Sequence, residues 1–319
     1  MDSKLKIISM DTVQAEEIKW LWKPYIPFGK LTIIQGDPGE EKTTFSLWLA
    51  SLLTQGKGFD EEGNLVQTEP VNVVYQTAED GLADTVKPRL IAAGADCSRV
   101  KVIDDSEKSL YMDDERLEKA LRETKAKLLI LDPLQAYLGD RVDMNRANEA
   151  REMTKKLGAM AERTGCAVIL VGHMNKGSGA KAAYRGIGSI DFFAIARSVL
   201  LVAKVPDDCS VRAVAQIKCN LAAEGSTVAF RLDENGFNWL GEYDISADEL
   251  LSGFAGGDRH KAAEDFLKKI LSNGKKVPAS SIFAQAKAIG VSKRTVESVK
   301  CELGVKSIKD GATWLWKME

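Results

Sequence analysis

Residues 31–44 read LTIIQGDPGEEKTT and decide the fold class of the chain. Mostly apolar residues run into a glycine-rich turn, and KTT begins a segment whose pattern predicts a helix over residues 45–54. A strand, a glycine-rich loop and a helix in this order form the context of a phosphate-binding P-loop. Lys42 would reach the β- and γ-phosphates and Thr43 the magnesium, while loop N–H groups surround the phosphates. The alternative is a strand-to-helix turn that contains GDPG by chance, which the position of KTT disfavours.

The expected nucleotide contacts are Gly36, Asp37, Pro38, Gly39, Glu40, Glu41, Lys42, Thr43 and Thr44. One of them departs from the pattern GxxxxGK, because Glu41 stands where a glycine is expected. Glycine lets the backbone approach the β-phosphate, whereas glutamate adds a Cβ and a negative charge. Three accounts are open: a degenerate loop that does not bind nucleotide, a sporadic or engineered substitution, and a loop that turns Glu41 outward. We expect weak ATP binding.

Short apolar runs alternate with amphipathic stretches along the first two thirds of the chain. The pattern predicts strands over residues 31–35, 71–76, 100–103, 127–131 and 167–171, and helices over 45–54, 81–93, 114–125 and 145–164. This alternation is typical of an α/β fold with a mainly parallel sheet that is covered on both faces. Residues 198–203, 211–218, 226–232 and 237–240 contain turn signals and no helix between them, and predict an antiparallel extension of that sheet.

Three other predicted strands end in polar side chains. Asp132 ends an apolar run in the form of a Walker B acid, which holds magnesium through water. Glu79 is a candidate for the base that activates the attacking water, and His173 for a contact to the γ-phosphate. Parallel strands share one carboxyl edge, so these side chains can converge on the P-loop. The structural alternatives are helix-capping carboxylates and a histidine that satisfies a loop hydrogen bond.

A glycine-rich linker at residues 252–258 divides the chain into an acidic and a basic part. Residues 1–257 hold 31 basic and 39 acidic side chains, whereas the remainder holds 13 and 7. We expect an ATPase domain at residues 1–251 and a separate domain at 259–319.

The C-terminal pattern predicts helices over residues 261–272 and 279–288, a third helix capped by Ser292, and a hairpin with Asp-Gly at its turn. This order is typical of a winged helix-turn-helix whose last helix enters the major groove of DNA. At least one of Trp314 and Trp316 should pack as core. The alternative is a three-helix adaptor that binds protein. Candidate DNA contacts are Lys293, Arg294, Lys300 and Lys309.

Other compositional signals exclude several classes of protein. The five cysteines form no CxxC pair and only two histidines are present, so a zinc site is not expected. No apolar run approaches the ~20 residues of a membrane helix, and the N-terminus lacks the apolar stretch of a signal peptide. We expect a cytoplasmic protein with reduced cysteines and no membrane partner.

Taken together, these motifs resemble those of the RecA-like motor ATPases, most closely plasmid RepA-type hexameric helicases and their RadA-like prophage relatives. The resemblance rests on GDPGEEKTT, TAED at residues 77–80, LLILDPL at 128–134, GHMNKGSG at 172–179 and YRGIGSIDFFAIARSVLLV at 184–202. It implies a RecA-like P-loop fold that uses ATP and Mg²⁺. By the same resemblance, Lys42 and Thr43 contact phosphate and magnesium, Glu79 is the catalytic carboxylate, Asp132 the Walker B acid and His173 a γ-phosphate sensor.

The resemblance also concerns contacts between subunits. It implies that Arg197 reaches the neighbouring subunit's nucleotide as an arginine finger, with Lys218 as a second contact in trans. Some relatives have a basic residue two positions after that lysine, where this chain has Asn220. Shared sites require a ring or filament, so a homo-oligomer follows, with a hexamer favoured.

The predicted function is that of a DNA-associated ATPase, a helicase or recombinase-like motor in the replication or recombination of a mobile element. One alternative is a catalytically degenerate DNA-binding regulator with a RecA-like fold that binds nucleotide poorly, which Glu41 favours. The other is an adaptor whose winged helix binds a protein partner.

Overall fold

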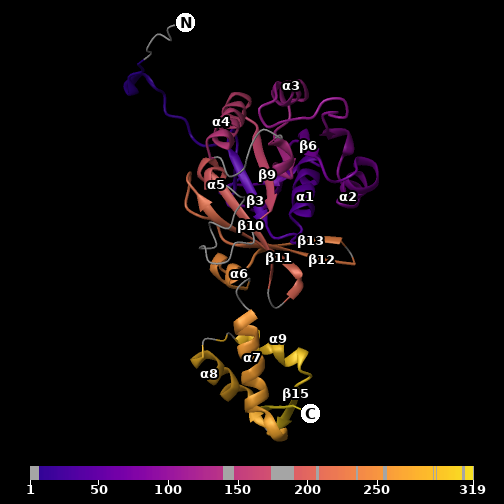
Figure 1. The fold of residues 1–319 in the computed structure, drawn as a ribbon, viewed down its shortest axis with the longest axis vertical. Helices are drawn as coiled ribbons and strands as arrows, with labels where there is room; N and C mark the ends of the chain where they lie inside the picture. The colour runs from indigo at the N-terminus through magenta and orange to yellow at the C-terminus, as the bar shows by residue number, and fades with distance from the viewer. Residues whose placement is uncertain are drawn as a thin grey trace.

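The computed structural model contains a large α/β unit followed by a small helical unit (Figure 1). It describes residues 7–138, 147–173, 190–205, 208–234, 236–253, 257–289, 291, 293–310 and 313–318. Within these residues nine strands form one sheet in the order β13-β12-β11-β10-β3-β9-β8-β6-β7. The strands are β3 (Leu31–Gly36), β6 (Val73–Thr77), β7 (Val100–Lys101), β8 (Leu128–Asp132), β9 (Ala167–His173), β10 (Ser198–Val205), β11 (Asp208–Cys219), β12 (Val228–Asp233) and β13 (Gly236–Glu242).

The predicted mainly parallel sheet with an antiparallel extension is confirmed, with one correction. Strands β3, β6, β7, β8 and β9 pair in parallel, and β11, β12 and β13 are antiparallel. Residues 198–203 were expected in the extension, but β10 is parallel to β3, with Ser198 opposite Thr32. The reason is that α5 (Ile190–Ile195) ends beside the amino end of β3, where the N–H of Arg197 donates to the carbonyl of Leu31. The antiparallel part therefore begins one strand later.

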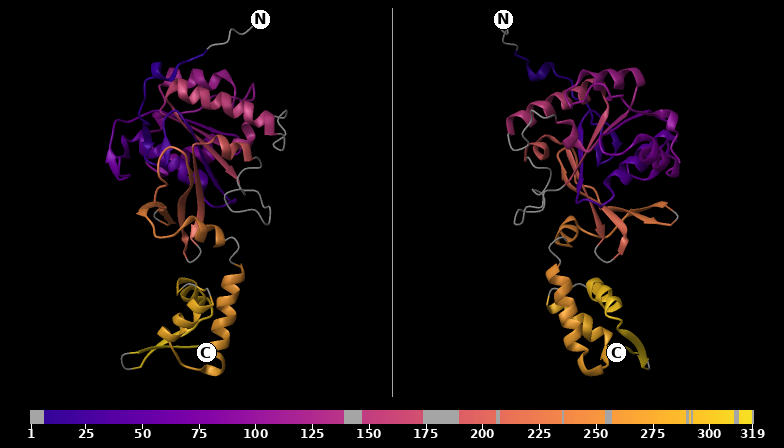
Figure 2. Two further views of the ribbon diagram at one scale, coloured as in Figure 1. Left: turned by 90° about the vertical axis from the view of Figure 1, so that its left-hand side faces the viewer. Right: turned by 45° about the vertical axis from the view of Figure 1, so that its right-hand side comes forward.

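Helices cover both faces of the sheet, because alternate residues of the buried strands point to opposite sides (Figures 1 and 2). Ile34 and Tyr75 pack on one face against α1 (Lys42–Thr54) and α2 (Lys87–Ala92). Ile33 and Val74 pack on the other face with α3 (Glu115–Thr124), α4 (Ala147–Thr164) and α5. The helix α6 (Ala247–Gly253) adds Leu250 to a smaller cluster against β10 and β11.

Several local predictions need correction. The helix expected over residues 81–93 is a π-helical turn at Leu82–Val86 followed by the short α2. Helix α1 starts at Lys42, three residues earlier than expected, so the lysine itself lies in its first turn. Two small antiparallel pairs were not predicted because their strands are too short to show a period. They are β1 (Trp20–Trp22) with β2 (Ile26–Pro27), and β4 (Lys57–Phe59) with β5 (Leu65–Gln67).

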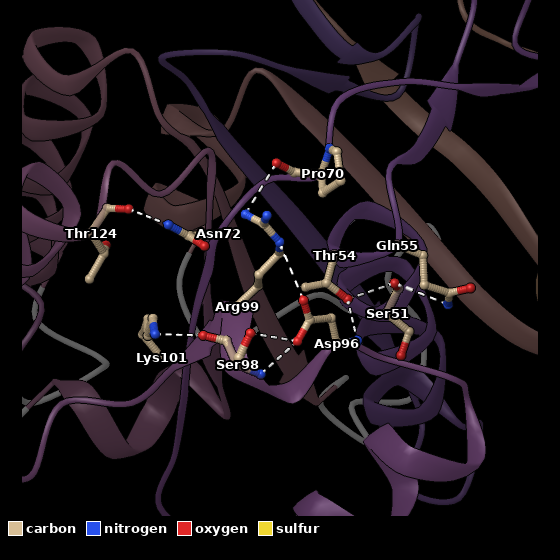
Figure 3. A network of polar contacts seen from close by, with 10 residues as sticks. All are labelled: Ser51, Thr54, Gln55, Pro70, Asn72, Asp96, Ser98, Arg99, Lys101 and Thr124. Atoms are coloured by element: carbon tan, nitrogen blue, oxygen red, sulfur yellow. Dashed lines mark hydrogen bonds and ion pairs between the residues drawn. The ribbon is translucent and has the colours of Figure 1, made fainter.

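A polar network holds the end of α1 that lies away from the P-loop (Figure 3). The N–H of Asp96 donates to Thr54 Oγ1 at 3.2 Å, and the Asp96 carboxylate pairs with Arg99 at 3.4 Å. Arg99 in turn donates to the carbonyl of Pro70 just before β6. The helix that begins at the P-loop is thereby fixed at both ends to the same sheet.

The C-terminal unit has its own core (Figure 2). Its elements are α7 (Gly257–Ile270), α8 (Ala279–Ala288), α9 (Lys293–Glu302) and a sheet of β14 (Val277–Pro278), β16 (Thr313–Lys317) and β15 (Lys306–Asp310). Trp316 is 4% exposed, which confirms that one of the two tryptophans packs as core. Helix α7 starts four residues earlier than expected, and β14 was not predicted. The predicted cap Ser292, the hairpin residue Gly311 and linker residues 254–256 lie outside the described residues.

None of the helices within the described ranges is both long and apolar enough to span a membrane.

Candidate nucleotide-binding site

Strand register brings the predicted site residues to one edge of the sheet. Gly36, the last residue of β3, is opposite His173, the last residue of β9. Asp132, the last residue of β8, is opposite Thr77 at the end of β6, and Glu79 follows two residues later. The P-loop, Asp132, Glu79 and His173 therefore lie at the carboxyl edge, where ligands bind in parallel α/β sheets.

The loop is pressed against strand β10 at its first residue. A Cβ on Gly36 would lie 2.2 Å from the carbonyl oxygen of Val202, so no other residue fits without moving the backbone. Two residues further along β10, the N–H of Lys204 donates to the buried carboxylate of Glu40 at 2.5 Å. The Lys204 ammonium lies 3.8 Å from the same carboxylate. The loop is thus held to β10 from both sides of Gly39.

Lys42 is folded back onto the loop. Its ammonium donates to the carbonyl oxygens of Gly36 and Asp37, both at 2.9 Å. Burial lowers the pKa of Lys42, and surrounding carboxylates, with Asp132 and Glu40 the largest contributors, act to raise it. The charge is therefore held within the loop, where a phosphate oxygen could replace the carbonyls as its partner.

The predicted magnesium ligands are in direct contact. Thr43 Oγ1 donates to Asp132 Oδ2 at 2.7 Å, and the hydroxyl of Tyr75 donates to the same oxygen at 3.2 Å. Burial raises the pKa of Asp132, while these two hydrogen bonds and the charge of Lys42 lower it. A hydroxyl and a carboxylate oxygen are the hard ligands that Mg²⁺ prefers, so the pair fits this ion.

Glu41 adopts the backbone conformation of a glycine. Its φ of 67° and ψ of 31° lie in the left-handed region, which L-residues other than glycine adopt only at a cost. Its carboxylate is turned toward α1, where it accepts a hydrogen bond of 2.6 Å from Thr44 Oγ1. This geometry corresponds to the outward-turned loop, the third of the three accounts given above.

Next to Glu79, a second carboxylate acts on the site. Glu79 is exposed, whereas Asp80 pairs with Arg89 at 3.1 Å and raises the pKa of the nearby Asp132. The N-cap of the following turn is Gly81, and no side chain caps it, so the helix-capping alternative for Glu79 and Asp80 is wrong. The Nδ1 atom of His173 is buried without a hydrogen-bond partner among the described residues. The loop motifs at residues 174–189 lie outside them.

Arg197 and Lys218 lie at the opposite edge of the sheet. Arg197 is beside Leu31, five residues before Gly36, and a strand of that length spans about 17 Å. Lys218 Nζ donates to the carbonyls of Phe193 and Ala194 at 2.5 and 3.1 Å. Burial, followed by the charge of Arg197, lowers the pKa of Lys218. Neither cation is near the P-loop of its own chain.

The candidate DNA contacts lie over aromatic rings. Lys293 is 4.8 Å from the centre of the Phe283 ring, and Lys300 is 4.7 Å from that of Trp316. Lys309 is 5.8 Å from the ring of Trp314. The side chain of Arg294 lies outside the described residues.

Several contacts at the site could not be predicted. Glu40 occupies a variable position of the motif, and Tyr75 is an interior residue of an apolar strand. The only local signal for Tyr75 is a hydroxyl in a run that is otherwise apolar apart from Asn72 and Gln76. A buried hydroxyl of this kind needs a partner, and here the partner is Asp132.

Comparison with known families agrees with this geometry. A family profile described as an AAA domain matches residues 3–179. The chain belongs to this family. The DNA repair protein RadA of Halalkalibacterium halodurans is 28% identical to this AAA domain protein over 169 residues. These residues make up 52% of this chain and 32% of RadA, so the match spans about a third of that relative.

Two solved structures resemble this AAA domain protein. The ATPase domain of a helicase has a TM-score of 0.50 at 15% identity, covering 66% of this chain and 84% of that domain. The KaiC-like protein PH0186 of Pyrococcus horikoshii has a TM-score of 0.48 at 19% identity, covering 69% and 93%. The similarity to the helicase ATPase domain concerns the fold, which is that of a RecA-like P-loop ATPase.

The raised pKa of Asp132 leads to a stability prediction. A buried acid with a raised pKa favours folding below its unfolded pKa, and this contribution is lost as the pH rises through the folded value. Asp132→Asn removes the unfavourable charge and keeps an oxygen for Thr43. We expect the ligand-free variant to be more stable than the wild type by about 1 kcal/mol at pH 7, with the difference shrinking in acid.

Thermal unfolding at pH 7 and pH 4 measures this difference. The matched control is Asp80→Asn, which removes a partly exposed carboxylate paired with Arg89 and should give no gain. A ligand-free Asp132→Asn protein that is less stable than the wild type at pH 7 would contradict the prediction.

Proposed function

We propose that this chain is a DNA-associated ATPase of the RepA-type helicase or RadA-like group, acting as a homo-oligomer. The observation that carries the proposal is the contact of 2.7 Å between Thr43 and Asp132, beside the ammonium of Lys42. Three motifs from different parts of the sequence meet there in the arrangement needed to hold a nucleoside triphosphate.

The reaction proposed is attack of water on the γ-phosphate of ATP. Lys42 would exchange the carbonyls of Gly36 and Asp37 for phosphate oxygens. Mg²⁺, held by Thr43 and Asp132, would neutralise charge on the phosphates. Glu79 would orient the water and accept its proton, and His173, with an unpaired buried nitrogen, would contact the γ-phosphate.

The oligomer is proposed from the place of Arg197. A cation that completes the charge of the transition state must reach the γ-phosphate, and Arg197 lies at the wrong edge of its own sheet to do so. It can act only on the site of a neighbouring subunit. A closed ring, with a hexamer favoured, places every Arg197 at a neighbour's site.

The C-terminal unit is proposed to be a winged helix that binds DNA, joined to the ATPase domain through residues 252–258. Helix α9 would enter the major groove, and the β15–β16 hairpin would be the wing. The excess of basic residues after residue 257 supports this role. The relative named as a DNA repair protein supports a place in replication or recombination, which we assign to a mobile element.

The test is ATP hydrolysis by the full chain with and without DNA. We expect hydrolysis that DNA stimulates several-fold, and loss of all activity in Lys42→Ala. The double variant Lys293→Ala/Arg294→Ala should keep basal hydrolysis and lose the stimulation, because its P-loop is unchanged. The matched control is Lys268→Ala, whose ammonium already pairs with Glu264. Equal stimulation of the wild type and the double variant would discard α9 as the DNA contact.

A second candidate is a regulator that binds DNA but hydrolyses ATP poorly or not at all. Glu41 favours it, because it occupies a glycine conformation and adds one more carboxylate near Lys42. Absence of hydrolysis together with salt-sensitive DNA binding would support this function.

A further inference from the structure

The structure points to Trp314 as a platform on which an unpaired nucleic-acid base stacks; this inference rests on the proposed DNA-binding function. We infer that the β15–β16 hairpin binds the end or junction of a duplex, where a base has a free face. Five of the six tryptophans are buried or half-buried, whereas Trp314 is 53% exposed. An exposed indole on a small basic unit has no role in the core of that unit.

Strand register determines which side of the hairpin carries Trp314. Lys309 is directly opposite Trp314, and Ser307 is opposite Trp316, so these four residues share one face. On this face Trp316 packs edge-on against Phe283, with ring centres 5.2 Å apart, and is buried. Trp314 is two residues nearer the turn and extends the same aromatic face beyond the core.

Basic side chains surround this extension. The hairpin segment 306–317 holds three lysines and one acidic residue. Lys309 lies 5.8 Å from the centre of the Trp314 ring, close to the ~6 Å limit of a cation–π contact, so the pair is loose. Lys300 of α9 lies over the neighbouring Trp316 ring. Phosphates of a strand that follows this face would meet ammonium groups on both sides of the indole.

The chemistry of an indole between lysines suits a single-stranded segment. Bases stack on aromatic side chains regardless of sequence, and lysines follow the backbone. A base inside a duplex is already stacked on both faces and offers none to Trp314. Only a strand end, an overhang or a junction has such a face, so Trp314 should distinguish these ends from continuous duplex.

The experiment compares the full chain on a blunt duplex and on the same duplex with a single-stranded overhang, by fluorescence anisotropy at low salt. We expect tighter binding to the overhang. Trp314→Ala should weaken binding to the overhang about 10-fold and leave the blunt duplex nearly unchanged. Trp314→Phe, which keeps a stacking ring, should retain most of the preference.

The matched control is Ile289→Ala, which removes another exposed apolar side chain of the same unit, 54% exposed, and should change neither affinity. Equal losses on both DNAs, or none on the overhang, would overturn the stacking role while leaving DNA binding intact. Binding of neither DNA by the wild type would overturn the proposed DNA function and this inference together. Thermal unfolding of Trp314→Ala and Trp314→Phe checks that both variants fold.

Discussion

Glu41→Gly should bind Mg-ATP about 100-fold more tightly than the wild type, which corresponds to about 2.7 kcal/mol. The carboxylate of Glu41 is turned toward Thr44, yet it stays at the mouth of the loop. At a distance of ~8 Å and an effective dielectric constant of ~20, repulsion from one phosphate charge is about 2 kcal/mol. Removal of the Cβ allows the backbone to come closer to the β-phosphate and accounts for the rest.

The same substitution should stabilise the ligand-free protein, because it relieves a left-handed glutamate. Relief of this conformation is worth about 1 kcal/mol, less the loss of the hydrogen bond from Thr44. Lys125, with a φ of 53° at the end of α3, provides a matched control. Lys125→Gly should raise stability by a similar amount and leave ATP affinity unchanged.

A further variant separates charge from backbone conformation. Glu41→Gln keeps the Cβ and the strained φ but removes the charge, so it should recover part of the affinity and none of the stability. Calorimetric titration with Mg-ATP measures the affinities of the three proteins. Equal affinities of the wild type and Glu41→Gly would show that the loop binds phosphate as it stands.

The sequence predicted the parts of the fold that depend on local pattern. Apolar runs that end in glycine or a carboxylate identified β3 and β8, because a buried strand needs continuous apolar residues and its end is free to be polar. The direction of β10 was not predictable in this way. Its residues form an ordinary buried strand, and only the return of the chain to Leu31 makes it parallel.

The candidate site shows the same division. Lys42, Thr43 and Asp132 belong to motifs, and the parallel sheet brings their ends together. The link between Glu40 and Lys204 joins positions 164 residues apart and has no local pattern. The outward turn of Glu41 likewise depends on its φ and on the hydroxyl of Thr44, which composition and spacing do not contain.

Mixed oligomers of two inactive variants should regain ATP hydrolysis. Arg197→Ala lacks the cation proposed to act in trans, and Asp132→Ala lacks the magnesium ligand of its own site. In a random equal mixture about one quarter of the sites combine an intact Asp132 with an intact Arg197 from the neighbour. Activity should therefore rise from background to about a quarter of the parent's, with Glu41→Gly as the parent if the wild type hydrolyses slowly.

The geometry of the sheet explains why recovery needs two subunits. About 17 Å of strand separates Arg197 from the P-loop of the same chain, so neither variant can repair its own site. A mixture of Asp132→Ala with Lys42→Ala is the matched control, because both lesions fall on the same side of the shared site and no combination restores it. Recovery in that control, or none in stable mixed oligomers of the first pair, would exclude a role for Arg197 in trans. Sites that depend on a neighbour's arginine would then link hydrolysis to assembly, since an isolated subunit has its phosphate loop and its arginine at opposite edges of one sheet.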